Sequence, residues 1–204
     1  MPAAIVDKII ISLATQYNKN IALVHRHFSK DWVEQWGRVQ RLEGGDDMYA
    51  SSLFHKVEDS RDATFVRVCK LLFVCSTISI FNPQYDQLVD VNANRRALPA
   101  VFRSQKFYGQ LQHILVVRLP ALPALGEHHP TVLFLAAIHS CKLETQNSLG
   151  MPYYQAMGTL EVVDMTCLQC LVARIPENES QKRYALVDCS GNIARSFYVD
   201  NGDN

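Results

Sequence analysis

The stretch KFYGQLQHILVVRLP, Lys106 to Pro120, decides the fold class of this chain. Apolar and polar residues alternate in part along it, and it ends at a proline, as a half-buried strand does. The connection ALPALGEHHP follows, and TVLFLAAIHSCKLE, residues 131–144, then reads as a second strand. Two long strands joined by a Pro- and Gly-punctuated connection indicate an antiparallel sheet.

Further strand patterns lie on both sides of this pair. The segments LEVVDMTCLQCLVARIP (160–176), KRYALVDCS (182–190) and ARSFYVD (194–200) follow it, and the short segment GRVQRL (37–42) precedes it. No clear helix separates most of them, which favours a small antiparallel barrel or sandwich. We therefore predict a mainly β chain of the α+β class, with a β-rich module at 37–200.

The first 36 residues show helical periodicity instead. Apolar residues recur at intervals of three or four, which predicts amphipathic helices forming a helical flank at 1–36. Ser29 is placed to cap a short helix within this flank. The residues of the apolar stripe are Ile5, Ile9, Leu13, Tyr17, Ile21, Val24, Phe28, Trp32 and Trp36.

Composition limits the classes of partner. The 20 Lys and Arg residues balance 20 Asp and Glu residues, which argues against a protein that depends on bulk attraction to phosphate. Six cysteines without a secretory signal or regular spacing predict reduced thiols in an intracellular protein. We expect no membrane segment, no cofactor and no small-molecule substrate.

The segment NANRRALPAVFRSQKFYG, residues 92–109, mixes basic and aromatic residues inside this neutral chain. Such a mixture is suited to contact nucleic-acid phosphate or an acidic tail of a protein partner. The alternative is an ordinary solvated loop that leads into a strand. The candidate binding residues are Arg95, Arg96, Arg103, Lys106, Phe107 and Tyr108.

Cys167 and Cys170 have the internal spacing of a zinc-binding pair, and are weak metal candidates. On one strand their side chains would point to opposite faces, so buried cysteines acting as small hydrophobic residues are the better interpretation. We therefore assign no metal. No local nucleophile motif occurs either, and the chain is predicted not to be an enzyme.

Several separate segments resemble a known family. WGRVQRLEGGDDMYASSL, YDQLVDVNANRR, FYGQLQHILVVRLP, EVVDMTCLQCLVARIP and RYALVDCSGNIARSFYV are similar to the region after the catalytic part of transposase open reading frames in CACTA-related, Plavaka-like elements of mushroom-forming fungi. The resemblance runs from about Trp36 to Val199, with the apolar run Val68 to Gln84 excluded. It implies a piece of a transposon-derived nuclear protein, without the acidic triad of the upstream ribonuclease-H-like domain.

The strand order is also similar to that of bromo-adjacent-homology (BAH) domains and SH3-like barrels, which bind histone tails or other proteins. This is an analogy of fold, and fold alone does not fix function. A cage for methyl-lysine would require two or three exposed aromatic side chains that converge. Its candidates are Phe107, Tyr108, Tyr153 and Tyr154.

The apolar run VCKLLFVCSTISIFNPQ, Val68 to Gln84, interrupts this pattern. Without it the flanks join as RDATFVRYDQLVDVN, which resembles the family's uninterrupted stretch. Its 17 codons match the length of a typical fungal intron, and Val-Cys-Lys and Gln are encodable as intron borders. We interpret the run as a translated retained intron, and thus as a non-native insertion; the alternative is a genuine strand with Cys69 and Cys75 buried.

Three functions remain open at this stage. The first is a non-catalytic interaction module that contacts chromatin, DNA or a protein through the basic and aromatic segment. The second is a fragment of a metal-dependent nucleic-acid-processing enzyme, in which Cys167 or Asp164 would be required. The third is a degenerate fragment without activity.

Overall fold

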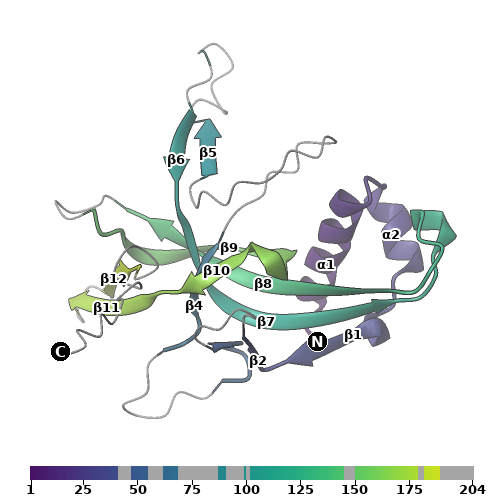
Figure 1. Ribbon diagram of the computed structural model, residues 1–204, viewed down its shortest axis with the longest axis horizontal. Helices are drawn as coiled ribbons and strands as arrows, with labels where there is room; N and C mark the ends of the chain where they lie inside the picture. Colours follow the sequence, from purple (N-terminus) through teal and green to yellow (C-terminus); the bar gives the residue numbers. More distant parts are fainter. Residues whose placement is uncertain are drawn as a thin grey trace, which may run out of the picture.

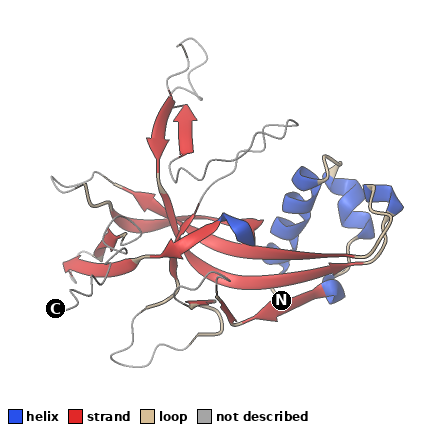
Figure 2. Cartoon of the chain, in the orientation of Figure 1, coloured by secondary structure: helices blue, strands red, loops and turns tan. Residues whose placement is uncertain are grey.

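The computed structural model describes residues 1–40, 47–54, 62–68, 87–90, 99, 102–144, 150–178 and 182–188, with the backbone alone for 87–90 and 102–105. Strands dominate, and the two α-helices lie together at one end of the molecule (Figure 2). The helices are α1 (Ala3–Gln16) and α2 (Ile21–His27), with short 3-10 turns η1 (Lys30–Trp32), η2 (Pro123–Leu125) and η3 (Met165–Cys167). The strands are β1 (Val33–Trp36), β2 (Arg38–Val39), β3 (Met48–Tyr49), β4 (Phe65–Val68), β5 (Gln87–Asp90), β6 (Phe102–Gln105), β7 (Phe107–Leu119), β8 (Thr131–Leu143), β9 (Tyr153–Asp164), β10 (Leu168–Leu171), β11 (Ala173–Asn178) and β12 (Arg183–Val187).

One antiparallel sheet organises the fold, in the order β10-β4-β7-β8-β9-β12-β11. The long β7–β8 hairpin at its centre confirms the two strands predicted from residues 106–144. Gly109 lies where these strands approach closely, since a Cβ atom there would come within 2.8 Å of the carbonyl oxygen of His139. Register shifts in β7–β8 and β8–β9 curve the sheet, as β-bulges do.

The chain from Leu168 to Asn178 closes the sheet on itself. Its first part, β10, pairs with β4, and its second part, β11, pairs with β12. Val172 lies between the two parts, and its amide donates to the carbonyl of Phe65 in β4. Both ends of the strand order are thus one continuous segment, and the sheet forms a nearly closed antiparallel barrel, as predicted for the fold class.

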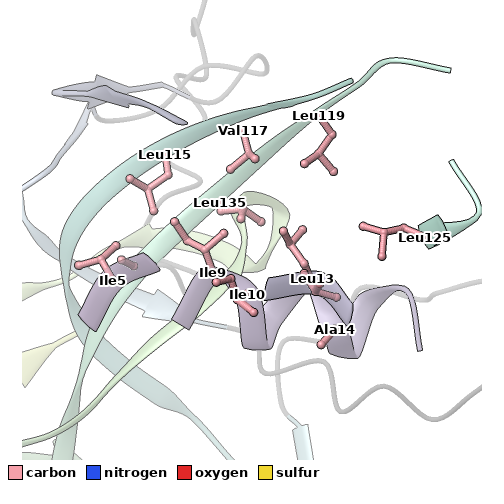
Figure 3. Close-up of a cluster of buried hydrophobic side chains, with 12 residues drawn as sticks. Ile5, Ile9, Ile10, Leu13, Ala14, Leu115, Val117, Leu119, Leu125 and Leu135 are labelled. Carbon is pink, nitrogen blue, oxygen red and sulfur yellow. The ribbon is translucent and has the colours of Figure 1, made fainter. Parts of the chain in front are cut away.

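Helices α1 and α2 cover the far end of the β7–β8 hairpin (Figure 1). The side chain of Asn20 caps α2 by accepting from the amide of Ala22, and Asn18 takes the left-handed conformation that ends α1. Figure 3 shows the apolar face of α1 directed at the sheet. We call the following buried residues the aliphatic core: Ile5, Ile9, Ile10, Leu13, Ala14, Val24, Leu115, Val117, Leu119, Leu125, Leu135 and Ala137.

The helical prediction for residues 1–36 is correct only in its first part. Ser29 caps η1 as expected, by accepting from the amide of Asp31. After this turn the chain extends into β1, which pairs with residues 114–117 of β7. Trp32 therefore lies in a 3-10 turn and Trp36 in a strand. Their spacing of four residues resembles that of a helix, but pairing with the edge of the sheet decides the structure here.

The single strand predicted across residues 160–176 is also wrong. It divides into the end of β9, strand β10 and the start of β11, and η3 separates β9 from β10. Asp164 ends β9 and caps η3, since its carboxylate accepts hydrogen bonds from the amide and the hydroxyl of Thr166. These local hydrogen bonds end β9 and reverse the direction of the chain, although apolar residues continue in the sequence beyond this point.

Candidate functional site

The predicted basic and aromatic segment includes a separate two-stranded hairpin. Strands β5 and β6 pair with each other, with Arg103 opposite Val89, and they are not part of the barrel sheet. The hairpin projects away from the barrel (Figure 1). Arg95 and Arg96 fall between the two strands in sequence and lie outside the described residues.

Charge is unevenly divided between this hairpin and the rest of the chain. Residues 87–105 contain three of the chain's 20 basic residues and one of its 20 acidic residues. The hairpin therefore has a formal charge of +2 and the remainder one of −2. The chain is neutral as a whole because a basic hairpin is balanced by an acidic remainder.

The barrel end of this segment lies partly at the surface and partly inside. Lys106 joins β6 to β7, and its half-exposed ammonium lies 3.8 Å from the carboxylate of Asp188. Phe107 is half-buried, and Tyr108 is buried with its hydroxyl donating to Asp188. Burial, followed by the charge of Asp188, raises the pKa of Tyr108. The six predicted residues therefore do not form one exposed surface, since Tyr108 faces inward.

Asp188 is the centre of a polar cluster that the sequence analysis did not find. Its carboxylate accepts from the guanidinium of Arg67 at 2.7 Å, and the side-chain oxygen of Gln169 accepts from Arg67 at 2.6 Å. Arg67 is only 4% exposed, although it lies in the apolar strand β4. Sulfur of Cys170 lies 4.0 Å from the other carboxylate oxygen of Asp188. The cluster ties β4, β7 and β10 to the end of β12.

A second Arg–Asp pair occupies another part of the barrel. Arg174 of β11 donates to Asp62 at 3.2 Å and to the hydroxyl of Tyr154 at 3.5 Å. Its guanidinium carbon lies 4.6 Å from the ring centroids of both Phe65 and Tyr184. Burial raises the pKa of Tyr154 to about 12. This pair also joins strands that meet where the barrel closes.

The exposed aromatic cage predicted from four residues is not formed. Tyr108, Tyr153 and Tyr154 are all buried, with exposed fractions of 9% or less. Each contacts a polar side chain of the same chain: Tyr108 contacts Asp188, Tyr153 lies under Arg183, and Tyr154 contacts Arg174. The rings serve internal packing, because the strands that carry them close the barrel.

Cys167 and Cys170 do not lie on one straight strand. Cys167 is buried in η3, and Cys170 is half-buried in β10. Among the described residues, no group of three or more His, Cys, Asp or Glu side chains is placed to hold a metal ion. Cys141, Cys167 and Cys170 are not joined in a disulfide, and burial raises the pKa of Cys141 to about 12.

His113 connects the helical end to the edge of the sheet. Its Nδ1 lies 3.0 Å from the hydroxyl of Ser52, which accepts from the amide of Gln35. Burial lowers the pKa of His113, and the charge of the terminal amine adds to this effect. The neutral imidazole is therefore favoured in the folded chain.

Comparison with protein-family models, curated proteins and solved structures gives no match for this chain. In the part of the chain that the structure describes, no helix has the length and apolar character needed to span a bilayer.

Proposed function

We propose that this chain is a non-catalytic interaction module of a transposon-derived nuclear protein, and that the β5–β6 hairpin contacts the DNA of chromatin. The observation that supports this is the projecting hairpin, which pairs apart from the barrel and concentrates basic residues. The resemblance to the transposase-associated region of Plavaka-like elements supports the nuclear context.

The arrangement suits a backbone contact more than base reading. A basic projection neutralises phosphates and releases condensed counterions, which gives affinity without sequence preference. The remaining chain has a charge of −2, so it would be repelled by the same polyanion. Binding through the hairpin keeps this acidic body at a distance from the phosphates. A single residue, Lys106, joins the hairpin to the central strand β7.

The test is a salt titration of duplex DNA binding by the wild type and by the double variant Arg95→Ala, Arg96→Ala. Loss of two phosphate contacts lowers the slope of log K against log salt by about 2. The matched control is Lys142→Ala, Lys182→Ala, which removes the same charge from exposed positions outside the hairpin.

The control double variant should retain the wild-type slope. Equal losses in the two double variants would show that binding follows net charge, and the hairpin proposal would then be wrong. The protein could instead bind an acidic peptide in preference to DNA, with the same dependence on Arg95 and Arg96. That result would show that the partner of the hairpin is a protein and not DNA.

A further inference from the structure

We propose that Phe65, Tyr154, Tyr184 and Asp62 form a cation-binding cage whose built-in occupant is Arg174. The cage belongs to the barrel and not to the β5–β6 hairpin, so the inference does not depend on the proposed function. Its ligand class is a guanidinium or small alkylated cation. In the natural chain, Arg174 itself holds the site.

Two aromatic faces enclose the cation. The guanidinium carbon of Arg174 is 4.6 Å from the centroid of Phe65 and 4.6 Å from that of Tyr184. Tyr154 completes the set: its ring stacks on Tyr184 at 5.5 Å and lies 6.1 Å from Phe65. Cations bind to ring faces within about 6 Å of the centroid, so both distances are suited to a cation–π contact.

The polar part of the cage is fixed in advance. The hydroxyl of Thr64 donates to Oδ1 of Asp62 at 2.6 Å, which orients the carboxylate. The other oxygen, Oδ2, accepts from Arg174 at 3.2 Å. A guanidinium has several donors in one plane, so it can bond Asp62 and the hydroxyl of Tyr154 while its faces contact the rings.

The cage has an opening to solvent. The side chain of Arg174 is 30% exposed and that of Asp62 is 19% exposed, whereas Phe65 and Tyr154 are buried. A small cation can therefore reach the site once the arginine side chain is removed. While Arg174 is present it competes intramolecularly, at a high effective concentration, and excludes a free cation.

The experiment measures thermal unfolding of Arg174→Ala with and without methylguanidinium at millimolar concentration. We expect methylguanidinium to raise the Tm of this variant, because a ligand that binds only the folded state stabilises it. The wild type should bind the ion about 10-fold more weakly or worse. The control is Arg183→Ala, because Arg183 has a similar exposure of 28% and contacts one ring, that of Tyr153.

Methylguanidinium should not raise the Tm of Arg183→Ala. An equal response of the two variants would overturn the cage. Proton NMR of the wild type provides a readout that needs no variant. Ring currents should shift the Arg174 δ protons upfield of those of Arg118, which pairs with Glu34 at the surface, and equal shifts would overturn the proposal.

Discussion

The aliphatic core under α1 and the interior of the barrel are held together in different ways. The aliphatic core contains only apolar side chains, contributed by α1, α2, the 3-10 turn η2 and strands β7 and β8. The barrel interior combines aromatic rings with two Arg–Asp pairs, Arg67–Asp188 and Arg174–Asp62. The aliphatic core is stabilised by burial of apolar surface area, whereas the barrel interior also requires that each buried charge has a partner of opposite charge.

This difference determines how each region responds to loss of a side chain. In an apolar core, a deletion costs the lost transfer free energy and the cavity, and neighbouring residues relax in part. In a buried ion pair, loss of one partner leaves the other charge desolvated and uncompensated. The barrel interior should therefore be less tolerant of substitution than the helical end, although it contains fewer aliphatic residues.

The largest effect is expected at Asp188. Asp188→Ala removes the carboxylate that accepts from Arg67 at 2.7 Å, and Arg67 is 4% exposed. Breaking such a buried pair costs about 3–5 kcal/mol in the free energy of unfolding. Urea denaturation followed by circular dichroism measures this change.

The control is the double variant Arg67→Met, Asp188→Ala, which removes both charges. It should recover much of the lost stability, because no buried charge remains unpaired. A double variant that is less stable than Asp188→Ala would show that the Arg67 side chain stabilises the barrel independently of Asp188, and the contrast between the two regions would then fail.

The next largest effect is expected in the aliphatic core. Leu13→Ala removes a fully buried side chain of α1, which should cost about 2–5 kcal/mol, toward the lower end if the helix settles onto the sheet. Ile11→Ala on the same helix is the control, because Ile11 is 43% exposed and should cost about 0.5 kcal/mol or less. Equal urea midpoints for the two variants would show that α1 does not pack as described.

The smallest effect is a pH dependence at the helical end. Burial lowers the pKa of His113 below its usual 6.5, so the unfolded chain binds a proton that the folded chain resists. The stability that His113 provides is present above pH 6.5 and is lost as the pH falls below it. Thermal unfolding across this range should show a smaller decrease for His113→Gln than for the wild type. A parallel decrease in both would assign the dependence to other groups.

The local pattern of apolar residues was sufficient to predict the long central strands and the first helix. Strands β7 and β8 were predicted because apolar and β-branched residues fill them and turn residues separate them, and α1 because Ile5, Ile9 and Leu13 form one stripe. The break at Met165 was missed because the hydrogen bonds that the Asp164 carboxylate accepts from Thr166 decide it. Closure of the barrel by residues 168–178 depends on long-range pairing, which no local pattern encodes.

The candidate site was predicted less well than the fold. Sequence located the basic segment, since composition alone shows it, but it placed Tyr108 on the surface. It missed Arg67 because the partner, Asp188, is 121 residues away along the chain. The one available signal was an arginine inside the apolar strand TFVRV, since a charge in such a position requires a buried partner.

The pairing of Val68 with Phe107 has a consequence for the apolar run at 68–84, of which Val68 is the one described residue. The 38 residues between these two positions form one excursion from adjacent strands, so barrel register does not depend on their number. Removing Val68 to Gln84 would bring Tyr85 to the position of Val68 and shorten the excursion to 21 residues. Chain-closure entropy changes by only about 0.5 kcal/mol for such a difference. Loop closure therefore differs little between the two lengths, and the constraint at this place in the barrel is the position of Val68, which is buried in a hydrophobic cluster.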